Sequence, residues 1–511
     1  MASTENLDLV IINPAQSGVY QPAQERSGYP AFEPPYLGLL TAAVVREKGY
    51  SVEVIDANAD GLSPESTAKR VAELKPQITH IIVHGNQPSA SSQLMDWVNS
   101  VGTNLADGSH HSRVILSGTH PSALPERTLK ESSGDLIVRG DGFNTLLDLL
   151  EGRRPSEIRG ALYLQDGKLA FGPQDRLATS EELARLPMAA WDLVDVSKYR
   201  AHDWHCLDNL DARQPYAAIY TSFGCPFSCT FCCINAPFNN GGEERNTIRF
   251  RNPKKIVDEL ESLVQKGVRN VKIIDEMFVF NPRHYVAIAN EIVKRGLGEK
   301  LNIWAYARVD TVKEGNLDLL KSAGFNWLGL GIESGSAHVR DGAEKSLDNS
   351  DIRNVVRSIQ SHGINVVGNY IFGLPDDTLE SMEQTMQLAR DVKAERPNFY
   401  SAMAYPGSEL HRMAQQQKLP LPPQWPQGRA LLPEDSGGPG WIGYSQHGYK
   451  TWPLPTAHLM PEEVLAFRDK SLQYFLSNDY RSLVETKFGK PTANLFCEPN
   501  AQTPKRKILG E

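Results

Sequence analysis

The stretch on which every other inference depends is Tyr220-Thr-Ser-Phe-Gly-Cys225-Pro-Phe-Ser-Cys229-Thr-Phe-Cys232-Cys233. An apolar, β-prone run from Ala217 to Thr221 stops at Gly224 and Pro226, so the sequence predicts a loop that leaves a strand and carries the cysteines. The C-x3-C-x2-C spacing places three thiolates on one short loop, close enough to hold one metal centre. Thiolate clusters select iron–sulfur clusters, zinc or Cu(I).

Three kinds of site compete for such a loop. A disulfide framework is disfavoured, because six cysteines in 511 residues with no secretory signal indicate a reducing compartment. A structural zinc site normally closes with four ligands in paired elements. Here no second pair follows, and the vicinal Cys233 would bind with poor geometry. An iron–sulfur cluster held by three cysteines leaves one iron without a protein ligand, and that open iron is a catalytic position.

Cys225-x3-Cys229-x2-Cys232, with the aromatic Phe231 just before the last cysteine, resembles the signature of the radical S-adenosylmethionine (radical SAM) superfamily. The resemblance implies a [4Fe-4S] cluster on Cys225, Cys229 and Cys232, which would be the metal-binding and catalytic residues. It also implies that the amino and carboxylate groups of SAM chelate the fourth iron, and that Phe231 lies near the adenine.

The composition indicates a multidomain protein without a nucleic-acid surface. A chain of 511 residues should hold two or three domains, each with its own core. The net charge of −8, with both signs dispersed, does not provide the basic patch that nucleic-acid binding requires. No apolar run reaches the roughly 18–20 residues of a membrane span, and the N-terminus lacks a signal region. We therefore expect a cytoplasmic protein.

Residues 1–152 are expected to form the first domain. The run Leu7-Asp-Leu-Val-Ile-Ile-Asn13-Pro14 predicts a buried parallel strand, and residues 35–49 predict a helix closed by glycine. Further strands are predicted at 51–56, 78–84, 114–117 and 135–138, each followed by a helix pattern. This alternation predicts a doubly wound parallel sheet, whose ligands lie beyond the carboxyl ends of the strands.

The strand ends of this domain carry glycines and hydroxyl or amide side chains. Such residues suit a large polar ligand that the backbone approaches closely, although each loop taken alone is also ordinary turn chemistry. Together, Pro35-x-Gly-Leu-Leu, Gly118-Thr-His-Pro-x-Ala-Leu-Pro and Val138-Arg-Gly-Asp-Gly resemble the cobalamin-binding domain of B12-dependent radical SAM enzymes. The resemblance implies cobalamin bound by Asn13, Pro14, Asp56, Gly85, Asn86, Gln87, Ser89, Ser117, Gly118, Thr119, His120, Gly140, Asp141 and Gly142.

One loop departs from the cobalamin pattern. Other cobalamin domains offer Asp-x-His-x-x-Gly after the first strand, with a histidine that ligates cobalt, whereas this chain has Asn13-Pro-Ala-Gln-Ser-Gly18. Many members of the radical SAM branch lack that histidine as well. We expect a side chain from residues 85–89 or from Thr119–His120 near the cobalt, without a strong bond. His120 is the one imidazole there that could form a strong bond to the cobalt, contrary to this expectation.

Residues 153–210 are expected to be an interdomain linker with a small hairpin at 161–164. From residue 217, strand and helix patterns alternate about every 30 residues, which predicts βα units. Six units fit the partial (β/α)6, TIM-like barrel of radical SAM enzymes over residues 211–408, with active groups at the strands' carboxyl ends. The strands are predicted at 217–222, 270–275, 301–306, 326–331, 364–371 and 398–403.

The ends of these strands match the SAM-binding segments of the family. Either carboxylate of Asp275-Glu276 would meet the SAM amino group, and Arg308 would face the SAM carboxylate or the substrate. Arg308 or Glu333 could instead belong to a structural ion pair. The segment Gly373-Leu-Pro could instead be a helix-entry turn, with Asp377 capping the helix. The resemblance implies SAM contacts from Phe231, Asp275, Glu276, Arg308, Glu333, Ser334 and Gly373.

Residues 409–511 break the alternation and are expected to form a mostly helical cap or substrate region. Residues 419–439, which include Trp425, predict a long loop. Residues 441–452 are aromatic and polar, which suits either a substrate pocket or packing across the barrel mouth. Helices are predicted at 459–477 and 479–488. The candidate substrate contacts are Trp441, Tyr444, His447 and Tyr449, and Cys206, Cys233 and Cys497 are expected to be thiols without a ligand role.

The resemblance implies an enzyme that cleaves SAM to a 5′-deoxyadenosyl radical and, in most B12-dependent relatives, transfers a methyl group from methylcobalamin. We favour a methyltransferase that acts on an unactivated carbon of a small-molecule intermediate of natural-product biosynthesis, with an external electron donor of the flavodoxin or ferredoxin type. Cyclisation or ring rearrangement without methyl transfer is the alternative. A cobalamin or iron–sulfur sensor is less well supported, because no output module is visible. The sequence leaves open the substrate and the choice between monomer and homodimer.

Overall fold

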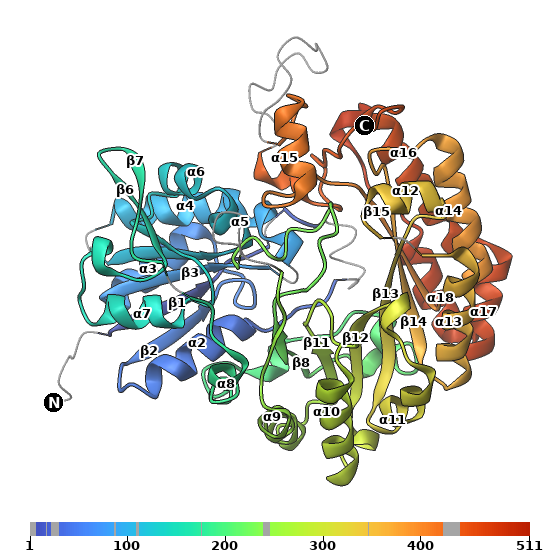
Figure 1. The fold of residues 1–511 in the computed structure, drawn as a ribbon, viewed down its shortest axis with the longest axis horizontal. Helices are drawn as coiled ribbons and strands as arrows, with labels where there is room; N and C mark the ends of the chain where they lie inside the picture. The colour runs from blue at the N-terminus through green and yellow to red at the C-terminus, as the bar shows by residue number, and fades with distance from the viewer. Residues whose placement is uncertain are drawn as a thin grey trace.

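A computed structural model describes residues 7–16, 18–21, 30–85, 88–108, 112–174, 176–238, 246–345, 347–422 and 440–511. It forms two α/β units side by side, with helices of the C-terminal region at the far side of the second unit (Figure 1). Asn86 and Gln87 of the predicted cobalamin site lie outside the described residues, as does Trp425 with most of its predicted loop.

The first unit is the predicted doubly wound sheet. Its parallel strands run in the order β2-β1-β3-β4-β5. Alternate residues of β1 point to opposite faces, so Leu9 and Ile11 join one apolar core and Val10 and Ile12 another. Helices α2 and α7 pack together on one face, and α3, α4 and α6 on the other. The bounds are β1 Leu9–Asn13, α2 Tyr36–Arg46, β2 Val52–Asp56, α3 Pro64–Leu74, β3 Ile78–Val83, α4 Met95–Ala106, β4 Arg113–Gly118, α6 Pro125–Ser132, β5 Leu136–Val138 and α7 Phe143–Leu150.

The hairpin expected in the linker extends this sheet instead. Strands β6 (Ala161–Gln165) and β7 (Lys168–Phe171) pair with each other, and β6 pairs antiparallel with β5. The sequence did not show where the hairpin would lie. The free edge of β5, to which β6 adds, exists only once the sheet has formed.

The second unit is a six-stranded parallel half-barrel, as predicted. Its strand order, β15-β14-β13-β12-β11-β8, follows the sequence without closing, and helices α9, α10, α11, α13 and α14 cover its outside (Figure 1). The bounds are β8 Tyr216–Ile219, α9 Pro253–Gln265, β11 Asn270–Ile273, α10 Pro282–Lys294, β12 Asn302–Arg308, α11 Leu317–Ser322, β13 Phe325–Glu333, α13 Asn349–Ser361, β14 Asn365–Phe372, α14 Leu379–Val392 and β15 Arg396–Ser401.

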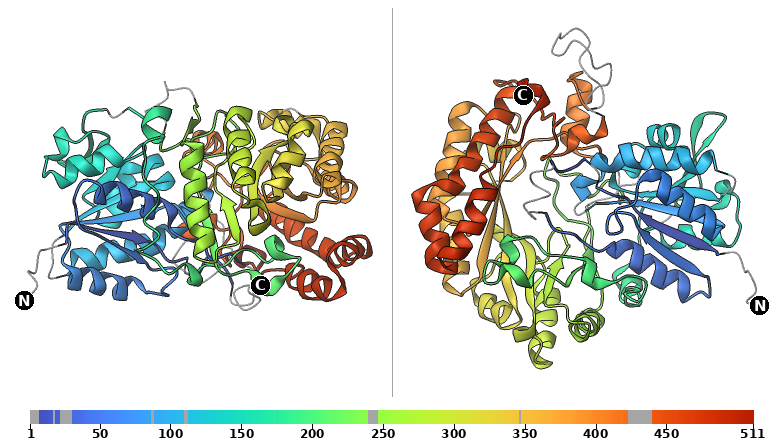
Figure 2. Two further views of the ribbon diagram at one scale, coloured as in Figure 1. Left: turned by 90° about the horizontal axis from the view of Figure 1, so that it is seen from below. Right: turned by 180° about the vertical axis from the view of Figure 1, so that it is seen from behind.

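The C-terminal region is helical and packs on the last strands of the half-barrel. Helix α16 (Pro461–Ser471) contacts β14 and β15, and α17 (Asn478–Phe488) packs against α18 (Lys490–Asn500). These helices lie on the side away from the first unit (Figure 2). Helix α18 was not predicted, because prolines stand near both of its ends. Among the described helices, none combines the length and apolarity needed to cross a membrane.

Buried charge pairs and an apolar core join the two units. Glu33, just before α2, accepts hydrogen bonds from Lys272 Nζ on β11 at 2.9 and 3.1 Å. Tyr36 of α2 contacts Arg251 and Glu259 of the second unit. One apolar core runs from the α2 face of the first sheet into the half-barrel. The two units therefore share a buried interface.

Candidate active site

The cysteine loop is held at both ends by its own backbone and side chains. Gly224 has a φ of +82°, and a Cβ there would lie 2.4 Å from the carbonyl oxygen of Thr247, so the approach to Cys225 requires glycine. The side chain of Asn235 accepts from the Cys225 N–H at 3.2 Å and donates to the Cys225 carbonyl at 3.0 Å. The loop is thus closed on itself around the three cysteines.

All three cysteines line one large cavity inside the half-barrel, with a volume of about 390 Å³. Burial raises the pKa of the Cys225 thiol to about 12 and raises that of Cys232 well above its ordinary value. Arg308 Nη1 lies 3.7 Å from Cys229 Sγ, and the charges of Lys345 and Arg308 oppose the rise in the pKa of Cys229. The two cations would stabilise a thiolate at Cys229.

The donor set fits an iron–sulfur cluster. Three soft thiols face one cavity from a single loop, which is the ligand type that such clusters take. Within the described residues, no three His, Cys, Asp or Glu side chains converge closely enough to hold a single metal ion. The thiols therefore suit a cluster, in which each binds a different iron, better than a mononuclear zinc site.

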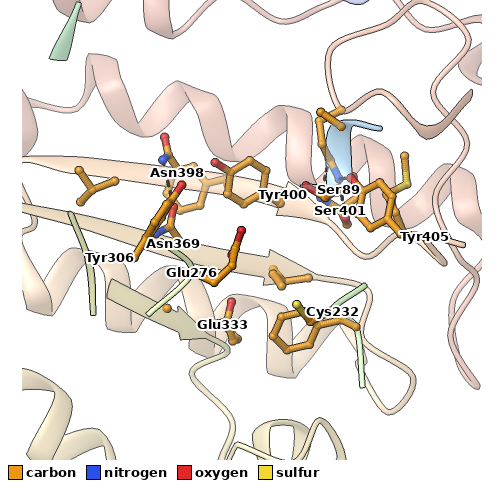
Figure 3. A pocket seen from close by; sticks show the side chains of 18 of the residues that line it. Ser89, Cys232, Glu276, Tyr306, Glu333, Asn369, Asn398, Tyr400, Ser401 and Tyr405 are labelled. Atoms are coloured by element: carbon orange, nitrogen blue, oxygen red, sulfur yellow. Dashed lines mark hydrogen bonds between the residues drawn. The ribbon is translucent and has the colours of Figure 1, made fainter. Parts of the chain in front are cut away.

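Four of the predicted SAM residues line the same cavity as the cysteines. Phe231, Glu276, Arg308 and Glu333 all face it, and Figure 3 shows the Glu276 carboxyl group pointing into the space. Burial raises the pKa of Glu276 to about 7, against the lowering effect of Lys272. Glu333 has a φ of +64° and pairs with Lys345.

The other three predicted SAM residues lie outside the cavity lining. Asp275 accepts hydrogen bonds from the N–H and hydroxyl of Thr221 and from the Ser222 hydroxyl, where the cysteine loop begins. Ser334 Oγ lies 3.2 Å from Thr385 Oγ1 of α14. A Cβ on Gly373 would lie 2.4 Å from Val464 of α16. Asp377 bonds to the N–H groups of Gly373 and Leu374, while Thr378 caps α14.

A second cavity, of about 90 Å³, lies at the ends of β4 and β5 and opens between the two units. Three buried polar atoms of its lining have no hydrogen-bond partner within the described residues: His80 Nδ1, Thr119 Oγ1 and Asp141 Oδ1. Such orphaned atoms fit a polar ligand such as part of cobalamin. The predicted residues that line this cavity are Ser117, Gly118, Thr119, Gly140, Asp141 and Gly142.

The remaining predicted cobalamin residues are dispersed. Asn13, Pro14 and Gly85 line a small space of about 30 Å³, and Ser89 faces the large cavity. Asp56 accepts from Asn13 Nδ2 at 2.8 Å and from the Tyr199 hydroxyl at 2.9 Å, an internal network. His120 is buried between Ser92 and the ring of Trp441, 4.4 Å away, and lines none of these three cavities. His120 therefore packs on Trp441, while its Nε2 has no hydrogen-bond partner within the described residues.

Two family models match the chain, in the same order as the two units. The first is the B12 binding domain, over residues 32–150, and the second is the radical SAM superfamily, over residues 219–389. The chain is a B12-binding radical SAM enzyme. Its cofactors are accordingly a [4Fe-4S] cluster, SAM and cobalamin.

Named relatives of this B12-binding radical SAM enzyme include methyltransferases and a cyclase. An uncharacterized methyltransferase of Pyrococcus horikoshii is 28% identical over 76% of this chain and 81% of its own length. The anaerobic magnesium-protoporphyrin IX monomethyl ester cyclase of Rubrivivax gelatinosus is 26% identical over 74% of this chain and 65% of its length. The methyltransferase TsrM of Kitasatospora setae has the same fold, with a TM-score of 0.66 at 17% identity, over 94% of this chain and 89% of TsrM.

The aromatic segment predicted to touch substrate divides between two roles in this B12-binding radical SAM enzyme. His447 lines the large cavity and stacks on Tyr20 at 5.0 Å. Trp441 and Tyr444 pack against the first unit, where Trp441 Nε1 donates to Glu131 at 2.8 Å. Tyr449 is 42% exposed. Only His447 of the four is thus positioned to reach a ligand in the large cavity.

Several lining residues of the enzyme were missed in the sequence. On β15, Arg396, Asn398 and Tyr400 follow each other at every second position, the spacing of one strand face. This alternation is the signal that could have identified them. The other polar or aromatic residues of the large cavity that were not predicted include Glu33, His202, Trp204, Trp304, Tyr306, Asn369, Gln446 and Arg468.

Proposed function

We propose that this cobalamin-dependent radical SAM enzyme is a methyltransferase that acts on an unactivated carbon of a small-molecule biosynthetic intermediate. One observation carries the proposal: a single cavity is lined both by the three cysteines and by Gln16, Ser89 and Gln93 of the first unit. A substrate carbon in that cavity is within reach of groups bound by either unit. Methyl transfer requires that arrangement.

When bound, the cluster and SAM supply radical generation and cobalamin supplies the methyl group. The protein's own residues bind the cofactors and enclose the cavity. Glu276, as a carboxylate, is placed to accept the SAM ammonium group, and that contact would lower its raised pKa. Arg308 lies beside Cys229 in the cavity lining, and its Nε donates to Asp310 Oδ1 at 3.0 Å. We propose that the two side chains orient SAM against the cysteine loop.

The C-terminal segment covers the β15 side of the large cavity. Gln446 accepts from the Ser401 N–H at 3.0 Å and donates to the Ser401 carbonyl at 2.8 Å, so it continues the hydrogen bonding of β15. Closing the cavity excludes water and oxygen from reactive species. His447, next in sequence, is then a candidate substrate contact.

A cyclase without methyl transfer is the second candidate, favoured by the match to the Rubrivivax cyclase over 74% of the chain. The reaction products distinguish a methyltransferase from a cyclase. We would incubate the anaerobically reconstituted protein with SAM carrying a deuterated methyl group, a reductant, and a small-molecule extract as the source of the methyl acceptor. A methyltransferase forms S-adenosylhomocysteine together with 5′-deoxyadenosine and passes the label to a product. Formation of 5′-deoxyadenosine alone would contradict methyl transfer, and the Cys229→Ala variant should form neither product.

A further inference from the structure

The two units are joined near both edges of the open half-barrel. In the strand order β15-β14-β13-β12-β11-β8, the buried contact between Glu33 and Lys272 lies on β11, next to one edge. A second junction lies at the other edge, where residues 441–452 run between the first unit and β15. We call residues 441–452 the strap. The large cavity is lined by Glu33 at the first junction and by Gln446 at the second.

Trp441 anchors the start of the strap in the first unit. Its backbone N–H and that of Ile442 donate to the Asp96 carboxylate of α4 at 3.2 and 3.0 Å. The indole Nε1 donates to Glu131 of α6, and the guanidinium carbon of Arg127 lies 4.3 Å from the ring centre. Only 2% of Trp441 is exposed. Burial together with polar and aromatic contacts is typical of a residue that anchors an interface.

The middle of the strap is also bonded to the first unit, through Ser445. The Ser445 hydroxyl is buried and donates to the carbonyl oxygen of Val19, in the loop after β1, at 2.9 Å. The same hydroxyl oxygen accepts from the backbone N–H groups of His447 and Gly448 at 3.2 and 3.1 Å. One side chain thus fixes both the local turn of the strap and its contact with the first unit.

The later part of the strap is held by the second unit. Gln446 bonds to the backbone of Ser401 at the end of β15. The fully buried Arg506 donates to the carbonyl oxygens of Gly448 and Gln446 at 2.7 and 3.0 Å. Its guanidinium also donates to the Asp469 carboxylate of α16 at 2.7 and 2.9 Å. Because α16 packs on β14 and β15, Arg506 ties the strap to the β15 edge.

We propose that the strap is a positioning element that fixes the first unit against the β15 edge of the half-barrel, with Trp441 as its anchoring residue. An open half-barrel joined to its neighbour near one edge can rock about that junction, and a second attachment at the other edge prevents the motion. The distance between bound cobalamin and the cluster depends on how the two units sit. A misplacement of about 1 Å can cost about 100-fold in rate, so either methyl transfer or cyclisation requires this distance to be fixed.

Electron paramagnetic resonance of the reconstituted full-length protein tests the strap without turnover. The [4Fe-4S] cluster is paramagnetic only when it is reduced, so its reduction raises the microwave power that half-saturates the signal of a nearby cob(II)alamin. This increase falls steeply with the distance between the two cofactors. We expect an increase in the wild type, loss of most of it in Trp441→Ala, and retention of most of it in Trp441→Phe, which keeps a buried ring. An unchanged increase in Trp441→Ala, or no increase in the wild type, would overturn the proposal.

A second variant releases the strap at its β15 end. Gln446→Ala removes both hydrogen bonds to Ser401 and should lose the increase as Trp441→Ala does. Both changes release the same element, so the double variant should lose no more than either single variant. Gln446→Ala removes no apolar core side chain, so it carries the test if Trp441→Ala does not fold. A full increase in Gln446→Ala would contradict the proposal.

The control separates the strap from a general loss of stability. Leu105→Ala removes a buried side chain from the same apolar core as Trp441, at the other end of α4 from Asp96, and should keep the wild-type increase. Iron and cobalamin per chain are measured for every variant, so that only fully loaded proteins are compared. Equal losses in Leu105→Ala and Trp441→Ala would overturn the proposal. Because no product is measured, the outcome is independent of whether the enzyme transfers methyl groups.

Discussion

The Asp275 carboxylate accepts a hydrogen bond from the backbone N–H of Thr221 at 2.6 Å, which ties the end of β11 to the start of the cysteine loop. The same carboxylate also accepts from the hydroxyls of Thr221 and Ser222. Burial raises the pKa of Asp275, and the hydrogen bonds from Ser222 and Thr221 oppose that rise. Asp275 therefore positions the cysteine loop and does not line the large cavity.

Replacing Asp275 by alanine should disorder the cysteine loop. Three buried donors lose their acceptor at once, and each unsatisfied group costs about 1–3 kcal/mol. We expect iron per chain after anaerobic reconstitution to fall by more than half, with a drop in the free energy of unfolding measured by urea. Asp275→Asn, which keeps one acceptor oxygen, should lose less. Full iron content in Asp275→Ala would show that the loop does not need this clamp.

Glu276 should make the stability of the cofactor-free chain depend on pH. Burial raises its folded-state pKa from 4.5 to about 7, with Asp275 adding to the rise. The unfolded state therefore loses its proton first, and the contribution of Glu276 is fully present below about pH 4.5 and is lost as the pH rises through 7. The difference in unfolding free energy between wild type and Glu276→Gln should change by about 2.5 kcal/mol from pH 5 to pH 8. Glu73→Gln, at an exposed carboxyl, is the control for the loss of a negative charge. A flat curve for Glu276→Gln would contradict the raised pKa.

The sequence predicted what depends on local pattern. The C-x3-C-x2-C loop, the β/α alternation and the strand-end residues Glu276, Arg308 and Glu333 all follow from short segments, and the structure brings them to one cavity. Ser334 and Gly373 carry equally good local signals, yet they pack against Thr385 and Val464. Those partners come from helices whose positions no strand-end motif encodes.

Arg396, which lines the large cavity, was missed for a related reason. The last strand was predicted at 398–403, so Arg396 fell outside it, whereas β15 begins at Arg396. For Trp441 the sequence left substrate contact and packing both open, since aromatic and polar composition cannot tell which neighbour a segment will meet. Its partners Asp96 and Glu131 lie more than 300 positions earlier in the chain.

Gly373 should tolerate no side chain. Its φ of +83° disfavours other residues, and a Cβ would lie 2.4 Å from Val464 on α16. Two controls separate the causes. Gly49→Ala meets the same backbone strain, at φ +87°, with nothing within 4 Å, and Gly315→Ala meets open space without a positive φ. By urea unfolding we expect Gly315→Ala to be near neutral, Gly49→Ala to lose about 1 kcal/mol and Gly373→Ala to lose about 2–4 kcal/mol. Equal losses for Gly373→Ala and Gly49→Ala would mean that α16 shifts freely.

Asp141 should separate retention of cobalamin from retention of iron. Its Oδ2 accepts from the Ala178 N–H at 2.7 Å and pairs with Arg249, while Oδ1 is unpartnered in the described structure and belongs to the cavity between the units. Asp141→Asn keeps the shape but leaves the Arg249 charge without its carboxylate. We expect cobalamin to bind about tenfold more weakly, read from the absorbance of the bound corrinoid after gel filtration, with iron content unchanged. Asp192→Asn, at an exposed ion pair with Arg46, is the matched control. A parallel loss of iron would indicate general damage to the interface, and unchanged cobalamin would remove Asp141 from the site.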